Sequence, residues 1–329
     1  MDLTKIYDLH LKVDHFEETF YILRGINLAV PMNSSLGIVG ESGSGKTMTC
    51  LSIMHLLPKG AKITKGEILF QGDDLCRYSD RQMEIIRGKK ISMIFQDARA
   101  ALNPVLTVED QIVDIYCHYT GKSRSVGMKK AVEVLGVMGF PNARSRIKSY
   151  PHELSGGMCQ RVLIAMALVS TPKLVIADEI TSGIDVTIQS QVIELVKHVC
   201  DELSASLILV SHDIGVIIEA CSDIAVMYSG IVFEQGSISK VLKKPLSPYT
   251  EELLKCFEIG HSDRMSFIPG TAPDLKLLKP GCPFAPRCKY VMDICKVEIP
   301  ELRRYEPSHA VACHKCVQDT KRKEINIFT

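Results

Sequence analysis

The order of apolar and polar positions predicts a mixed α/β protein. Residues 3–30 alternate apolar and polar side chains in short bursts, which is typical of antiparallel strands with one exposed face. Residues 174–178 and 207–211 are instead continuous apolar runs rich in β-branched side chains, separated by an amphipathic stretch at 186–203. Buried strands that alternate with helices predict a parallel sheet.

Two further regions have patterns of their own. Residues 107–169 repeat apolar positions with the 3.6-residue period of several helices, so we expect a helical insert at about 97–170. Beyond about residue 259 the periodicity is lost, and seven of the 15 prolines and five of the 12 cysteines fall there. We therefore predict two domains, 1–258 and a loop-rich extension at 259–329.

Composition and charge exclude several classes of protein. The 329 residues are 46% hydrophobic and 23% charged with a net charge of +1, as in an ordinary soluble protein without whole-chain attraction to nucleic acid. The longest apolar run, residues 162–169, is far shorter than the ~20 residues that cross a bilayer. The first residues lack the apolar core of a secretion signal, so we expect a cytoplasmic protein with reduced or metal-bound cysteines.

Residues 40–47 fit the phosphate-binding pattern G-x-x-x-x-G-K-[ST] at every fixed position. A predicted strand at 35–39 leads into this P-loop and a predicted helix at 47–57 leads out, as the motif requires. Glycines let backbone N–H groups face the phosphates, Lys46 supplies a cation, and the Thr47 hydroxyl can bind Mg²⁺. The predicted nucleotide-binding residues here are Gly40, Glu41, Ser42, Gly43, Ser44, Gly45, Lys46 and Thr47.

Two other segments carry chemistry that suits a nucleotide. Asp178 and Glu179 end an apolar strand, and in a P-loop protein the first acid can hold Mg²⁺ while the second polarises an attacking water. Ser155, Gly156 and Gly157 precede a predicted helix and would form a second anion site at its N-terminus. Because one nucleotide has one triphosphate, a second phosphate-binding segment requires an explanation.

These motifs together resemble the ATP-binding subunits of ABC transporters, in which Leu-Ser-Gly-Gly contacts the nucleotide held by the partner subunit. The resemblance covers roughly residues 3–258. It implies an ATPase that binds ATP and Mg²⁺, with a RecA-like P-loop NTPase core, an antiparallel β subdomain and a helical subdomain. It also implies that Gln96 contacts Mg²⁺ or the water, that His212 contacts the γ-phosphate, and that Asp185 belongs to a D-loop with altered neighbours.

An aromatic side chain stacks on adenine in this family. We predict Phe16 for that role, with Tyr21 as a rival. The resemblance further implies that two such domains face each other head to tail, and that hydrolysis removes the γ-phosphate that joins them.

The extension contains a cluster of cysteines with the spacing C-x5-C-x6-C-x17-C. Clustered cysteines in a reducing compartment indicate a metal site more readily than disulfides. The spacing is not a standard zinc pattern, and His309 or His314 could also be ligands, so these residues leave zinc and iron–sulfur open. The four candidate ligands are Cys282, Cys288, Cys295 and Cys313.

A narrower resemblance concerns the extension itself. Residues 245–250, 269–270 and 281–288 resemble the C-terminal extension of dipeptide, oligopeptide and nickel importers, some of which hold a [4Fe-4S] cluster. The resemblance thus implies that the four cysteines bind such a cluster, with Cys316 to spare. Residues 97–108 also resemble this group, in a region where the family docks cytoplasmic helices of the permease.

The leading hypothesis is therefore the ATPase subunit of a peptide-type importer, peripheral at the cytoplasmic face of the cell membrane. Implied partners are a second ATPase subunit, preferably a different chain, two integral-membrane permease subunits and an extracytoplasmic substrate-binding protein. One alternative is a soluble ABC ATPase of DNA repair or translation, and another is a metal-sensing regulator without turnover. Dipeptides, oligopeptides, nickel and metallophores all remain open as cargo.

Overall fold

A computed structural model describes residues 2–15, 18–140, 142–181, 186–257 and 268–319. Contacts divide the chain into two compact units. The first unit comprises residues 1–30, 35–77 and 210–329, and the second comprises residues 31–34 and 78–209.

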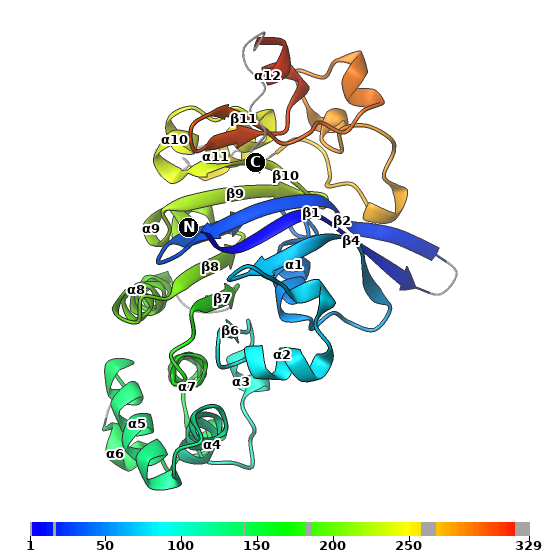
Figure 1. The fold of residues 1–329 in the computed structure, drawn as a ribbon. Coiled ribbons are helices and arrows are strands. Elements are labelled where there is room, and N and C mark those ends of the chain that lie inside the picture. The colour runs from blue at the N-terminus through cyan, green and yellow to red at the C-terminus, as the bar shows by residue number, and fades with distance from the viewer. Residues whose placement is uncertain (1, 16–17, 141, 182–185, 258–267, 320–329) are drawn as a thin grey trace. The chain divides into compact units, whose positions relative to one another are not determined.

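The first unit contains an antiparallel sheet with the strand order β2-β1-β4-β5 (Figure 1). In β2, Leu23, Ile26 and Leu28 are buried while their neighbours are partly exposed, which confirms the antiparallel sheet predicted from the N-terminal alternation. The strands are β1 (Asp2–His15), β2 (Glu18–Pro31), β4 (Ala61–Phe70) and β5 (Asp73–Asp74).

A second group of strands in this unit has the order β11-β12-β10-β9-β3. β3 pairs with β9 in parallel, whereas β9, β10 and β12 pair antiparallel. The strands are β3 (Ser35–Val39), β9 (Asp223–Tyr228), β10 (Ile231–Ser237), β11 (Arg303–Glu306) and β12 (His309–Val311). The helices are α1 (Lys46–Met54), α9 (Ile214–Ala220), α10 (Ile238–Lys243), α11 (Pro248–Phe257) and α12 (His314–Asp319). Short 3-10 turns are η1 (Leu75–Arg77), η4 (Leu275–Leu277), η5 (Ala285–Arg287) and η6 (Asp293–Lys296).

The second unit pairs two buried strands in parallel, β6 (Ile91–Ile94) and β7 (Leu174–Asp178). The strand next to β7 is β8 (Ser206–Ser211), whose last two residues belong to the first unit. One helix precedes β6, several helices fill the predicted insert, and one separates β7 from β8 as expected. They are α2 (Asp80–Ile86), α3 (Ala98–Ala101), α4 (Val108–Thr120), α5 (Arg124–Val137), α6 (Ala143–Arg146), α7 (Gly156–Leu168) and α8 (Val186–Glu202), with the 3-10 turn η2 (Pro151–Glu153).

The C-terminal extension is more ordered than its proline content predicts, because its hairpin β11–β12 continues the sheet at β10 (Figure 1). Glu234 in β10 is fully buried and accepts hydrogen bonds from His309 Nε2 at 2.7 Å and from the backbone N–H groups of Leu246 and Ser247 at 2.8 Å. A buried carboxylate is stable only when such donors replace water. Glu234 therefore joins β10, β12 and the start of α11.

Candidate nucleotide site

The P-loop connects β3 to α1 and depends on two of its glycines. A Cβ at Gly40 would lie 2.1 Å from the carbonyl oxygen of Met227. This distance is too short for any side chain at that position. Gly45 caps α1 with φ +100°, and a Cβ there would meet Leu23 at 2.7 Å. The loop therefore follows its path closely against β9 and β2, and the predicted strand-loop-helix setting is confirmed.

The Lys46 side chain lies inside the P-loop. It is buried, and Nζ donates to the carbonyl oxygens of Gly40 at 2.8 Å and Glu41 at 3.2 Å. The ammonium group and the N-terminus of α1 thus stand on the same short segment, which is the arrangement that attracts phosphate oxygens.

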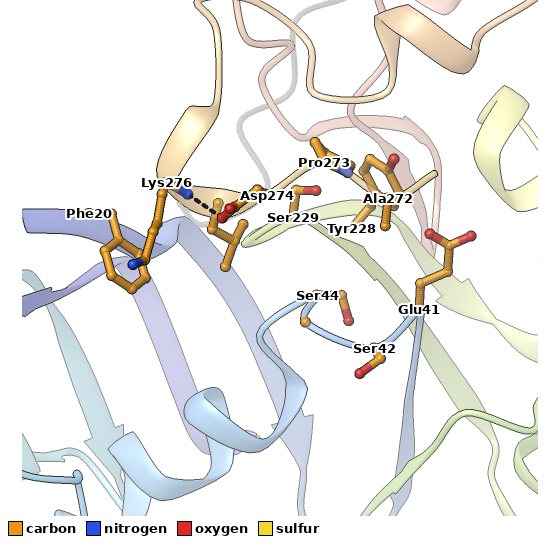
Figure 2. Close-up of a pocket in the computed structure, with 12 residues that line it drawn as sticks. Phe20, Glu41, Ser42, Ser44, Tyr228, Ser229, Ala272, Pro273, Asp274 and Lys276 are labelled. Atoms are coloured by element: carbon orange, nitrogen blue, oxygen red, sulfur yellow. Dashed lines mark hydrogen bonds between the residues drawn. The ribbon is translucent and has the colours of Figure 1, made fainter. Parts of the chain in front are cut away.

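A cavity of about 270 Å³ opens beside the P-loop within the first unit (Figure 2). One wall is made by residues 41–44 of the loop and another by Tyr228 and Ser229, where β9 ends. The extension supplies a third wall through residues 272–276, and Phe20 of β2 completes the lining. The P-loop therefore forms one wall of a partly open cavity and is not an isolated surface turn.

Phe20 lines the cavity with an aromatic ring that was not predicted from the sequence. Lys276 Nζ lies 5.6 Å from the centroid of its ring. The predicted rival Tyr21 is not among the lining residues and packs edge-on against His10, with ring centroids 6.4 Å apart. Neighbouring residues in a strand point to opposite faces of the sheet, so only one of Phe20 and Tyr21 can face the cavity. The alternation of the strand was the signal that could have identified Phe20. The predicted adenine-stacking Phe16 lies outside the described residues.

In the second unit, the predicted Mg²⁺ ligand and the predicted catalytic acid lie at the C-terminal end of the buried strand β7. Asp178 is its last residue and is 6% exposed, and Glu179 follows with φ +48°. Gln96 Nε2 donates to Glu179 Oε2 at 3.3 Å. The structure thus brings together Gln96 and Glu179, the two residues predicted for the catalytic site.

Ser155, Gly156 and Gly157 were predicted to precede a helix, whereas α7 already begins at Gly156. Ser155 is the N-cap, and its Oγ accepts a hydrogen bond from Met158 N at 3.4 Å. Ser155 and Gly156 are exposed and Gly157 is partly so. The signature segment therefore presents a helix N-terminus at the surface of the unit.

His212 lies in the turn between β8 and α9 of the first unit and is exposed. Ser211 Oγ accepts from the backbone N–H of Asp213 at 3.0 Å, and Asp213 caps α9, so both neighbours of His212 are held in place. The D-loop residues 182–185, which include Asp185, lie outside the described residues. The prediction that residues of both units complete one Mg²⁺–ATP site stays a prediction.

The cysteines of the extension give no evidence for a bound metal. Cys282, Cys288, Cys295 and Cys313 line one small cavity of about 20 Å³. However, within the described part of the chain, no three or more histidine, cysteine, aspartate or glutamate side chains form a group that could hold a metal ion. Burial raises the pKa of the Cys282 thiol to about 12, whereas a hydrogen bond from Cys316 lowers the pKa of Cys313. The predicted iron–sulfur cluster and its zinc alternative are therefore unsupported by the structure.

Comparison with known families and proteins gives two matches along the chain. Residues 23–182 match the ABC transporter family, and residues 233–295 match the family described as the oligopeptide/dipeptide transporter C-terminal region. None of the helices in the described ranges has the length and apolar character needed to cross a membrane.

Individual relatives match most of the chain. The dipeptide transport ATP-binding protein DppD of Bacillus subtilis is 42% identical over 316 residues, which cover 94% of this chain and 93% of that protein. The oligopeptide transport ATP-binding protein OppD of Salmonella typhimurium is 38% identical over 319 residues, covering 96% of this chain and 95% of its own. Among solved structures, the ATP-binding cassette MJ0796, a dimer in a post-hydrolysis state bound to ADP and Pi, covers 71% of this chain and 98% of its own, with 27% identity and a TM-score of 0.65.

The motifs and the comparisons agree on one family. The P-loop lies in a strand-loop-helix unit, Glu179 follows a buried strand beside Gln96, and the extension matches a region found in peptide transporters. The chain therefore belongs to the ATP-binding subunits of ABC transporters, in their dipeptide and oligopeptide group, and couples ATP hydrolysis to transport.

Proposed function

We propose that this chain powers the import of dipeptides or longer oligopeptides across the cytoplasmic membrane. The observation that carries the proposal is the presence, in one chain, of the ATP-binding cassette and the oligopeptide/dipeptide type of C-terminal region. Relatives named for dipeptide and oligopeptide transport match both parts together. Nickel and metallophores are the competing cargo.

Each step of the ATP reaction has a residue of suitable chemistry. Backbone N–H groups of residues 40–47 and the Lys46 ammonium bind the phosphates, and the Glu179 carboxylate accepts a proton from the attacking water while Gln96 orients that carboxylate. His212 donates a hydrogen bond to the γ-phosphate. Mg²⁺ neutralises charge on the phosphate oxygens when bound, and the hard oxygen donors that would hold it are Thr47, Asp178 and Gln96.

A second ATPase subunit completes the proposed site. Ser155, Gly156 and Gly157, with Asp185, would contact the nucleotide held by the P-loop of the facing subunit, which we expect to be a related but different chain. The exposed N-terminus of α7 supports this role because its N–H groups are directed outward for an anion to reach. Two permease subunits and an extracytoplasmic binding protein are the other proposed partners, and residues 97–108 are the proposed docking region at the cytoplasmic face.

Reconstitution tests the cargo. The chain, two candidate permease subunits and a candidate binding protein are placed in liposomes with ATP inside, and uptake of a labelled dipeptide, a labelled pentapeptide and nickel is compared. We expect a peptide-loaded binding protein to stimulate ATP hydrolysis and to drive peptide uptake. Uptake of nickel alone would assign the metal group, and stimulation by DNA or ribosomes instead would favour the soluble ABC ATPases of repair or translation.

We further propose that Cys282, Cys288, Cys295 and Cys313 bind a [4Fe-4S] cluster. The four side chains line one cavity, although the described residues form no site for a single metal ion. Each cysteine of a cluster binds a different iron, so the sulfur atoms need not approach as closely as around one zinc ion. Anaerobic purification with iron and sulfide analysis should find about four of each per chain. One zinc per chain, or no metal, would contradict the cluster.

A further inference from the structure

The extension contacts the P-loop through an arginine. Arg287, the last residue of η5, forms a bidentate ion pair with Glu41, the second residue of the P-loop. Its Nη1 donates to Glu41 Oε2 at 2.7 Å and its Nη2 donates to Glu41 Oε1 at 3.0 Å. Figure 2 shows the Glu41 carboxylate directed away from Ser42 and Ser44. The segment that carries the cysteines therefore holds the loop that binds phosphate.

Every N–H group of the Arg287 guanidinium has a partner. Besides Glu41, Nη1 donates to the Tyr228 hydroxyl at 3.1 Å, Nη2 to Ile268 O at 3.0 Å and Nε to Pro269 O at 2.7 Å. These bonds use all five donors that a guanidinium possesses. The side chain is only 6% exposed, so the geometry is set by the fold and not by solvent.

A second contact holds the same P-loop residue through its backbone. The N–H of Glu41 donates to the hydroxyl of Tyr249 in α11 at 3.1 Å, and Tyr249 is fully buried. Its ring packs against Tyr228, with centroids 4.6 Å apart, and against Phe284 of the extension at 5.3 Å. Both the charge and the backbone of Glu41 are thus fixed from outside the P-loop.

We propose that Arg287 is a positioning residue for ATP binding. By pairing with Glu41, it holds the start of the P-loop in its phosphate-binding conformation and neutralises a carboxylate that would otherwise repel the triphosphate. Arg287 acts through Glu41 and need not touch the nucleotide. The extension consequently contributes to nucleotide affinity in addition to any role in the transporter.

Substitutions in the full-length chain test this coupling. We expect R287Q to weaken ATP binding about tenfold, an effect typical of contacting charged pairs, and to raise KM for ATP while kcat at saturation changes less than about twofold. R287K restores the charge but offers three donors without the planar fork, so it should recover only part of the affinity. The double variant E41Q/R287Q removes the unpaired carboxylate and should bind ATP better than R287Q.

Lys289 provides the matched control, because it lies two residues away and pairs with Glu251 and Glu252 at 3.1 Å without contacting the P-loop. K289A should leave the dissociation constant for ATP unchanged. The proposal is overturned if R287Q binds ATP as tightly as the natural chain, or if affinity across all variants simply follows the midpoint of thermal unfolding. If R287Q does not fold, the variant E41Q tests the same ion pair from the P-loop. The proposal then requires that E41Q changes the affinity for ATP while its melting temperature stays close to that of K289A.

Discussion

Gln96 and Glu179 are 83 residues apart in sequence, and the amide of the first donates to the carboxylate of the second at 3.3 Å. The contact exists because β6 and β7 pair in parallel, so that their C-terminal ends, and the residues that follow them, meet at one edge of the sheet. The predicted acid and the predicted glutamine are therefore neighbours in the fold.

Replacing Glu179 with glutamine should stop hydrolysis and preserve ATP binding. The substitution removes the base that accepts the proton of water but keeps a side chain that can hydrogen-bond Gln96, so we expect a loss of about a hundredfold or more in single-turnover rate. Rapid-quench hydrolysis and equilibrium dialysis measure the two properties. E194Q, the same change on the exposed face of α8, is the control, and full single-turnover activity in E179Q would exclude Glu179 as the base.

Replacing Lys46 with alanine should abolish nucleotide binding. The variant loses the ammonium that the loop carbonyls hold beside the phosphate position, and we expect the affinity for ATP to fall about a hundredfold or more. Isothermal titration measures the loss. K62A removes a lysine that is 69% exposed in the same unit and should bind ATP normally. Equal binding by both variants would refute the assignment of the P-loop.

Phe20 and Tyr21 offer a test with adjacent residues on opposite faces of one strand. Stacking of a base on an aromatic ring contributes about 1–3 kcal/mol, so F20A should raise KM for ATP by roughly fivefold or more. Y21A should leave KM unchanged, because that ring packs on His10 and does not line the cavity. Steady-state ATPase assays on F16A, F20A and Y21A compare all three aromatics, and an effect confined to F16A would confirm Phe16 as the residue that stacks on adenine.

His309 tests how the extension is fastened to β10. H309A leaves the buried Glu234 without one of its donors, which should lower the free energy of unfolding by about 2 kcal/mol. K296A breaks only a pair with Asp293, which is 98% exposed, and should leave the free energy of unfolding almost unchanged. Urea denaturation gives both values. Equal losses would show that the buried pair does not anchor the extension.

Several features could be predicted because their signals are local. Apolar runs placed β3 and β7, and the motif between residues 40 and 47 required a turn that only glycine permits. The hairpin β11–β12 was not predicted, because a proline-rich segment gives no local sign that it pairs with β10. The contact that joins them, between Glu234 and His309, links residues 75 positions apart in the sequence. Open sheet edges accept any strand that arrives with matching register.

By itself, the sequence determined the chemistry of the nucleotide-binding residues, since strand periodicity, glycine spacing and the identity of Lys46 or Glu179 are properties of short segments. Only the tertiary structure decided what holds those segments. Arg287 reaches Glu41 across 246 residues, and Phe20 rather than Tyr21 faces the cavity. Such contacts depend on how sheets and turns pack together, and the free energy that selects them comes from burial and from pairing of distant charges, which no local pattern records.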